Sequence, residues 1–397
     1  MFLNLDLSCF PDVSAKTGRK GYSKQALLCA DIVMKCECFS CITDLLDYLQ
    51  NNLLIAYYCG FDITKPLPSY WTLERFIKNV DNKLLKAVMS NQVKELYELG
   101  IIDTSFIALD STPVSANTKL NNPKSFAKNK FSKDNHPSCD KDCGLGVHTA
   151  SNQHNERNFE YYWGYKNHIL VDCITGLPIY ELTTTADVAD CTVTTDILDN
   201  ANAVLSLNEC SFIADKGYDV KSIYNYVKTV FNGDCFIPLN KRNTKSNKLM
   251  SEHPICEAGL AMHKDGKLTD NGRTRQKYCC PFKRSKSGVC PCNHKNWNNG
   301  KKTRGCTKYI TIPDDYRLSI DRECVSFKKI YALRTEVERY NSRFKQSGQE
   351  RLWIRSQKAA ENLNSIAHIS LLATALAAVV TQSKASYRSP KNCKRIA

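Results

Sequence analysis

Four polar residues recur at spacings that would place them on one side of a helix. Residues 331–345 (YALRTEVERYNSRFK) contain no glycine or proline, which predicts a helix. At about 100° per residue, Arg334, Glu338 and Lys345 all lie within about 60° of Tyr331. A carboxylate flanked by Arg and Lys suits a site that handles metal ions and phosphates. The alternative is a surface helix with an ordinary Arg–Glu pair four residues apart.

Two aspartates stand at the ends of short apolar segments. Residues 105–110 (SFIALD) and 211–215 (SFIAD) each predict a buried strand that ends on a carboxylate, Asp110 and Asp215. Gly217 follows the second aspartate and suits a tight exit from the strand. Asp219 is a nearby alternative, but it lies past the expected turn, and Asp215 is therefore preferred.

These residues carry a resemblance to a known family. The spacing Tyr-x2-Arg-x3-Glu-x6-Lys within residues 331–345 is similar to the signature of one large group of bacterial insertion-sequence transposases. Enzymes of that group carry a DDE triad on an RNase H-like fold. The sequences ALDST at Asp110 and ADKGY at Asp215 resemble the family's two aspartate motifs. A looser resemblance covers the first 100 residues, through GY and PSYWTLERF.

The resemblance implies a reaction and a set of roles. Asp110, Asp215 and Glu338 would hold two Mg²⁺ (or Mn²⁺) ions, with Asp110 bridging both; such pairs of ions lie about 3.5–4 Å apart. The residues implied to bind DNA backbone near the cut are Tyr331, Arg334 and Lys345. The enzyme would hydrolyse the 3′ end of the transposon, and the freed 3′-hydroxyl would then attack target DNA. No covalent protein intermediate and no nucleotide cofactor are implied.

The predicted fold is α/β, an RNase H-like mixed sheet flanked by helices. The expected segments are a helical N-terminal DNA-binding domain (1–100), a catalytic core in two parts (101–240 and 307–382), a basic Cys-rich insertion (241–306) and a basic tail (383–397). Within the core we expect a polar loop at 117–158, a helix at 191–205, a returning strand at 309–313, a helix at 322–346 and a core helix at 356–380. A plain packing role for residues 1–100 is the alternative, because no basic recognition helix stands out.

A predicted hairpin adds two further candidates. Residues 159–172 and 177–183 flank a turn at 175–176, which predicts two antiparallel strands. The phrase GYKNHILVD in the first strand resembles the family, which implies that Lys166 and His168 approach DNA. A structural role for the histidine is the stronger interpretation.

Charge and cysteine concentrate in the insertion. Residues 241–310 hold 17 Lys and Arg against 4 Asp and Glu, so this segment carries most of the net charge of +15 and favours nucleic acid as a partner. Cys279 or Cys280, with Cys290, Cys292 and Cys306, could form a structural zinc site. The competing interpretation is free cysteines, since the C-x-C step is tighter than the usual C-x2-C.

Composition bounds the class of protein. With 397 residues, 42% of them hydrophobic, the chain can bury a sizeable core. Twenty cysteines without a signal-peptide pattern indicate reduced thiols or metal ligands in a cytoplasm, which the resemblance implies is bacterial. The longest apolar run, residues 366–380, is interrupted by polar residues and is shorter than a bilayer span, so we expect a buried helix and no membrane. The expected partners are double-stranded DNA, at transposon ends and target, and a second copy of this chain in a synaptic complex.

Two other functions fit part of the pattern. One is an RNase H-like DNA nuclease without strand transfer, and the other is a non-catalytic, transposase-derived DNA-binding protein. The presence of all three carboxylates argues against the second.

Overall fold

The computed structural model describes residues 5–10, 21–121, 131–151, 157–240, 254–270, 273–283, 305–311 and 315–381. By its contacts the chain divides into two compact units, Met1–Pro238 with Arg322–Ala397, and Leu239–Asp321. The N-terminal helices therefore share one unit with the central sheet. The DNA-binding role expected for residues 1–100 stays a prediction.

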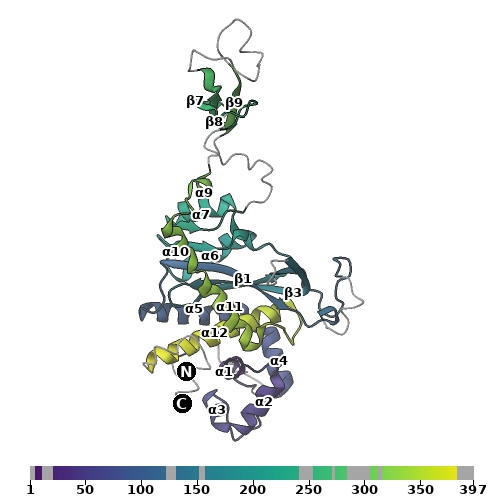
Figure 1. Cartoon of the computed structure of the whole chain (residues 1–397). Coiled ribbons are helices and arrows are strands. Elements are labelled where there is room, and N and C mark those ends of the chain that lie inside the picture. The colour runs from purple at the N-terminus through teal and green to yellow at the C-terminus, as the bar shows by residue number, and fades with distance from the viewer. Residues whose placement is uncertain are drawn as a thin grey trace. The chain divides into compact units, whose positions relative to one another are not determined.

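A mixed sheet of six strands forms the centre of the larger unit (Figure 1). Its strands are β1 (Phe106–Ser115), β2 (Gly144–Ser151), β3 (Arg157–Asp172), β4 (Pro178–Thr185), β5 (Ser211–Ala214) and β6 (Asp234–Phe236). The order is β2-β3-β1-β5-β6, with β4 also on β3. Strands β1, β5 and β6 run parallel, and β3 is antiparallel to its three neighbours. The predicted hairpin of β3 and β4 is confirmed.

Helices cover both faces of this sheet. Figure 1 shows α6 and α7 on one side and α5, α11 and α12 on the other. The helices of this unit are α1 (Lys24–Cys36), α2 (Ile42–Asn51), α3 (Leu53–Tyr58), α4 (Tyr70–Asn79), α5 (Asn82–Glu98), α6 (Thr194–Val204), α7 (Lys221–Phe231), α10 (Val325–Ala332), α11 (Thr335–Phe344) and α12 (Gln357–Val380). Short 3₁₀ turns occur at Lys119–Asn121, Asp190–Thr192 and Lys216–Tyr218.

Helix α12 is the core helix of the unit. Its 24 residues are long and apolar enough to cross a membrane, but 83% of the apolar window is buried inside the protein. Helices α1, α4 and α5 and strand β4 all contact it. This arrangement confirms the buried helix that the sequence predicted.

A buried hydrogen bond ties the N-terminal helices to the segment after α11. Lys35 of α1 donates from Nζ to Gln349 Oε1 over 2.9 Å, and both side chains are buried. Gln349 closes a π-helical turn, Lys345–Gln349, and in turn donates to Asn364 of α12. Gly348 in this turn has φ +85°, a conformation that favours glycine, and a Cβ added to it would lie 3.5 Å from Phe39 O.

The predicted continuous helix over 322–346 is wrong. Helix α10 ends at Ala332 and α11 begins at Thr335, with a tight turn in which Arg334 N donates to Tyr331 O. The two pieces pack on different neighbours: Phe327 of α10 contacts Phe236 of β6, whereas α11 lies on β1 and β3. Tertiary packing therefore sets the break, although no glycine or proline marks it.

The smaller unit holds a separate antiparallel sheet. Its strands are β7 (His263–Asp270), β8 (Arg273–Cys279) and β9 (Thr307–Thr311), in the order β7-β8-β9, followed by the short helix α9 (Tyr316–Ser319) and with a 3₁₀ turn at Pro281–Lys283. The expectation that residues 309–313 form a strand returning to the core is therefore wrong. Strand β9 covers part of this segment, but it pairs with β8 and not with the core sheet.

Candidate active site

Asp110 and Asp215 are neighbours across the parallel strands β1 and β5. The last residue pair of that ladder is Leu109 opposite Ala214, so each aspartate is the next residue on its strand. Both carboxylates therefore leave the sheet at the carboxyl end of the parallel pair, where ligands bind in open α/β sheets. The expectation that β1 ends at Asp110 is wrong, because the strand continues to Ser115 along β3.

The Asp110 carboxylate is held by helix α11. Asn341 Nδ2 donates a hydrogen bond to Asp110 Oδ2 over 3.0 Å. Burial raises the pKa of Asp110 to about 7, although the Arg334 guanidinium opposes the shift. The neighbouring carboxylates of Asp215 and Asp190 push the pKa further upward. Negative charge at this point is costly unless a cation offsets it.

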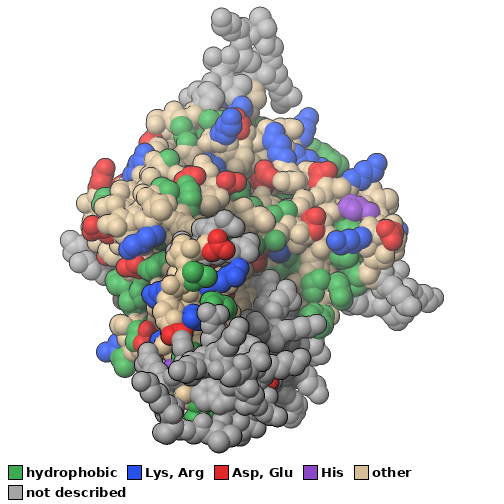
Figure 2. Space-filling model, turned by 90° about the horizontal axis from the view of Figure 1, so that it is seen from above, with side chains coloured by type: hydrophobic (Ala, Val, Ile, Leu, Met, Phe, Trp, Pro, Cys, Tyr) green, Lys and Arg blue, Asp and Glu red, His purple; other side chains and the backbone are tan. Residues whose placement is uncertain are grey.

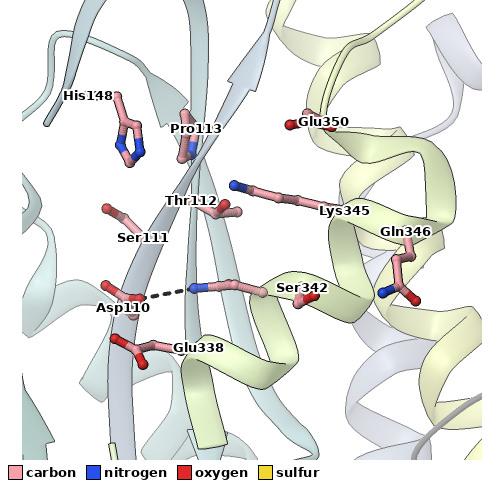
Figure 3. Close-up of a pocket in the computed structure, with 11 residues that line it drawn as sticks. Asp110, Ser111, Thr112, Pro113, His148, Glu338, Ser342, Lys345, Gln346 and Glu350 are labelled. Atoms are coloured by element: carbon pink, nitrogen blue, oxygen red, sulfur yellow. Dashed lines mark hydrogen bonds between the residues drawn. The ribbon is translucent and has the colours of Figure 1, made fainter. Parts of the chain in front are cut away.

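Glu338 reaches the same pocket from α11. A cavity of about 470 Å³ is lined by Asp110, Glu338, Lys345 and neighbouring residues, and Figure 3 shows the two carboxylates side by side. Glu338 accepts a hydrogen bond from Arg334, whose guanidinium carbon lies 6.0 Å from the centre of the Tyr331 ring. The four residues of the sequence signature are thus drawn together despite the break between α10 and α11.

Asp215 caps the 3₁₀ turn that follows β5. Its Oδ1 accepts from Gly217 N over 2.5 Å, and a Cβ at Gly217 would lie 2.7 Å from that oxygen. Burial raises the pKa of Tyr331, and the Arg334 guanidinium opposes this shift. The negative charge of Asp215 raises the same pKa further, so Asp215 lies near the α10–α11 break. The alternative, Asp219, is buried and accepts from Tyr224 over 3.0 Å, a structural position.

A comparison with protein families identifies the family of this chain. The model of the transposase DDE domain matches residues 102–373, which hold all three carboxylates. The chain belongs to the DDE transposase family. The match begins just before β1 and ends inside α12, so the residues of the smaller unit lie between its bounds.

Distant similarities to solved structures accompany the family match. The chain is similar to piggyBac transposase in a synaptic complex with hairpin DNA, at 11% identity and a TM-score of 0.43, over 99% of this chain and 74% of that one. It is similar to Mos1 transposase in a paired-end complex with the left transposon end (11%, TM-score 0.18, 56% and 62%) and to a Mos1 mariner paired-end complex with Mn (10%, TM-score 0.18, 57% and 61%). The chain thus spans about three fifths of these Mos1 chains. Comparison with curated proteins gives no match.

The donor atoms of the DDE domain fit a hard divalent cation. Carboxylate oxygens are the ligands that Mg²⁺ and Mn²⁺ prefer. The Oδ1 atom of Asn341 is buried and has no hydrogen-bond partner among the described residues, so one more oxygen faces this region without a donor. Each carboxylate accepts a hydrogen bond within the protein: Asp110 from Asn341, Asp215 from Gly217 and Glu338 from Arg334. Among the described residues, no group of three His, Cys, Asp or Glu side chains is arranged to hold a metal ion.

Lys166 and His168 lie on β3 beside β1, and the groups that they contact are not the three candidate carboxylates. Lys166 Nζ donates to Val188 O and to Asp190 over 2.9 and 3.0 Å. His168 is fully buried, its Nε2 lies 2.9 Å from Thr184 Oγ1, and burial lowers its pKa to about 4. Because its ring does not reach the surface, this burial favours the structural interpretation of His168. The DNA contacts expected for Lys166 and His168 stay predictions.

Sequence reasoning missed three residues of the site. Asn341 follows Glu338 by three positions, one helical turn, so the same spacing argument could have found it. Glu350 lines the pocket through the π-helical turn, which no pattern predicts. His148 lines it from β2, inside the segment that was expected to be a loop.

Part of the candidate zinc set can be placed. Cys279 ends β8, and Cys280 N donates to Cys306 O over 3.0 Å, so these residues are close. Cys280 and Cys306 belong to a buried cluster with Cys256, Met262 and Tyr278. Cys290 and Cys292 lie outside the described residues.

Proposed function

We propose that this chain is a transposase of the insertion-sequence group with the Tyr-Arg-Glu-Lys signature, and that it cuts DNA at transposon ends and joins them to target DNA. The observation that carries the proposal is the pairing of Leu109 with Ala214, which brings Asp110 beside Asp215. Glu338 lines the same pocket as Asp110. Three acidic residues that are far apart in sequence thus approach one edge of the sheet.

Phosphodiester cleavage gives each residue a task. Bound Mg²⁺ or Mn²⁺ would activate the attacking water and relieve charge on the leaving oxygen. Asp110, Asp215 and Glu338 would supply the oxygen ligands, and Asp110, whose pKa is raised by burial to about 7, would bind the cation as its carboxylate. Asn341 fixes the orientation of the Asp110 carboxylate.

The cationic side chains position the DNA strand. Lys345 lines the pocket beside Asp110 and Glu338, where its ammonium can contact a phosphate. Arg334 donates a hydrogen bond to Glu338, and its guanidinium would bind a phosphate if Glu338 turned toward a bound cation. Figure 2 shows Lys and Arg mixed with acidic side chains over the described residues of one face. The strongest positive charge instead belongs to residues 241–310, which we propose contact the transposon-end DNA through its phosphates.

The working form is proposed to be a homodimer on DNA. Joining two transposon ends needs two sets of catalytic carboxylates, and each chain offers one set. The site is proposed to act in the bacterial cytoplasm, on chromosomal DNA.

A strand-transfer assay tests the proposal. Labelled duplexes carrying the inverted repeats that flank the reading frame are incubated with Mg²⁺ and a supercoiled target. Cleavage and joined product are expected; cleavage without joining would identify a nuclease, and binding without either would identify a non-catalytic DNA-binding protein. Asp110→Asn should bind the ends and cut nothing. The matched control is Asp234→Asn on β6, whose side chain is 57% exposed and paired with Lys228, and it should cut normally.

A further inference from the structure

The outer end of β3 carries exposed aromatic side chains. Residues 157–163 of this strand pair only with β2, because β1 and β4 pair with residues from 164 onward. Phe159 and Tyr161 point to the same face of this two-stranded ribbon, two residues apart, and are 61% and 44% exposed. Val147, directly opposite Tyr161 on β2, is 48% exposed. Adjacent apolar exposure of this kind marks an interaction site.

These aromatic residues line a pocket and do not simply protrude. A cavity of about 720 Å³ is bordered by Phe131, Phe159, Tyr161 and Tyr162. The Phe131 and Tyr161 rings are stacked, with centroids 6.3 Å apart and planes inclined by 20°. The Tyr162 ring lies against β2 at Gly146, where a Cβ would come within 2.6 Å of the ring. The pocket therefore presents ring faces that are held in place by their neighbours.

This aromatic pocket is continuous with the catalytic pocket. Pro113, His148, Lys345 and Glu350 line both cavities. Lys345 therefore lies between the carboxylates and the aromatic rings. Its ammonium group can bind the phosphate of a nucleotide whose base extends into the second cavity.

We infer that the aromatic pocket binds an unpaired nucleotide of the DNA strand whose phosphate lies at Asp110 and Glu338. The inference rests on the proposed function, because it assumes that DNA is the substrate. An aromatic ring can stack only on a base whose face is free, and in a duplex the neighbouring bases cover both faces. Exposed rings beside a phosphate-binding lysine therefore fit a single-stranded segment and do not fit the side of a duplex. The stacking accepts any base, because each has a π-face.

The test compares two DNAs in EDTA, where no cleavage occurs. One is a blunt duplex and the other is the same duplex with an overhang of five deoxyadenosines containing 2-aminopurine. The wild-type chain should bind the overhang DNA about tenfold more tightly and quench the 2-aminopurine, as stacking of one or two bases predicts. The double variant Phe159→Ala/Tyr161→Ala should lose this preference and the quenching. Its slope of log affinity against log salt concentration (the salt slope) should be unchanged.

Two further variants make the result specific. Tyr57→Ala/Tyr58→Ala removes two tyrosines of α3 that are 60% and 54% exposed, and it should behave as wild type. Lys345→Ala should weaken both DNAs and reduce the salt slope, because it removes a phosphate contact. Thermal unfolding should be close to wild type for all three variants, since the altered side chains are at least partly exposed.

Several outcomes would overturn the inference. Equal wild-type affinity for the two DNAs, or a preference that survives the double variant, removes the nucleotide site. An equal loss on both DNAs assigns the aromatic residues to duplex binding, and a change of sedimentation without a change of DNA binding assigns them to a second copy of the chain. Failure of the proposed function looks different: the overhang preference persists while Mg²⁺ and end DNA give no cleavage.

Discussion

Asn341 on α11 donates a hydrogen bond to Asp110 on β1 across 3.0 Å, and this contact joins the helix of Glu338 to the strand of the first aspartate. The two carboxylates are therefore set relative to each other by a neutral amide. A lysine in the same place would compete with a metal ion for the carboxylate, whereas an amide orients it without adding charge.

Asn341→Ala is expected to lower the rate of cleavage roughly 10- to 100-fold, the range typical of partners that orient a metal ligand. Binding of end DNA should stay within about twofold of wild type, because Asn341 contacts Asp110 and not the exposed surface. Single-turnover cleavage and fluorescence anisotropy separate the two effects. Ser342→Ala, at the next and exposed position, is the control, and equal rates in all three proteins would remove Asn341 from the site.

The ionisation of Asp110 should appear in the stability of the metal-free protein. Its pKa is raised from 3.8 to about 7 in the folded state, so folding favours the protonated acid and stability is lost as pH rises from about 4 to 7. Asp110→Asn cannot ionise. In EDTA its Tm should match wild type near pH 4 and exceed it increasingly toward pH 8.

Adding Mg²⁺ at pH 8 should reverse that order, by raising the Tm of wild type and leaving Asp110→Asn unchanged. Differential scanning fluorimetry over this pH range measures both effects. Parallel curves for the two proteins in EDTA would show that the carboxyl group has an ordinary pKa.

Gly217 should be essential for the placement of Asp215. A Cβ at this position would lie 2.7 Å from Asp215 Oδ1, so Gly217→Ala must displace the carboxylate from the Gly217 N–H. We expect the cleavage rate to fall at least about tenfold, since moving a catalytic group out of position commonly lowers the rate by more than that. Gly21→Ala is the matched control, because nothing lies within 4 Å of a Cβ there. Retained activity in Gly217→Ala would argue that Asp215 is not a ligand.

The salt dependence of DNA binding should distinguish two lysines. Lys345 lines the catalytic pocket, so Lys345→Ala should reduce the slope of log affinity against log salt by about one. Lys166→Ala should leave the slope unchanged, because its ammonium is bonded to Val188 O and Asp190. Both slopes come from anisotropy titrations between low and moderate salt. A reduced slope for Lys166→Ala would support the predicted contact of this residue with DNA.

Metal analysis tests the cysteine-rich insertion. If Cys279 or Cys280 and Cys306 share a zinc ion with Cys290 and Cys292, protein purified under reducing conditions should contain about one zinc per chain. Cys306→Ser should lose it, whereas Cys173→Ser, a buried cysteine of the larger unit, should keep it. Less than one zinc per two chains, with no effect of chelator on melting, would leave free cysteines as the explanation.

Sequence patterns located the three candidate carboxylates better than the helices and strands that carry them. Asp110, Asp215 and Glu338 were recognisable because apolar runs ending on a carboxylate and a helical spacing are local signals. The break after Ala332 was not, since it follows from contacts of α10 with β6 and of α11 with β1 and β3, which lie far away in sequence.

The missed strand β2 illustrates the same limit. Its sequence GLGVHTAS has two glycines and no alternation of apolar and polar residues, so it gives no strand signal. Pairing with β3 nevertheless makes it a strand. His148 and the aromatic pocket depend on this pairing, and for that reason sequence patterns alone did not reveal them.

The bond between Lys35 and Gln349 has an evolutionary consequence. If a relative's first hundred residues replaced these and lacked the lysine, the buried Gln349 amide would lose its hydrogen-bond donor. If Gln349 were replaced instead, the buried Lys35 ammonium would lose its acceptor, and either change destabilises the fold. The leading helices cannot be shuffled as an independent cassette. Changes in these helices are therefore expected to arise by substitution within an intact chain.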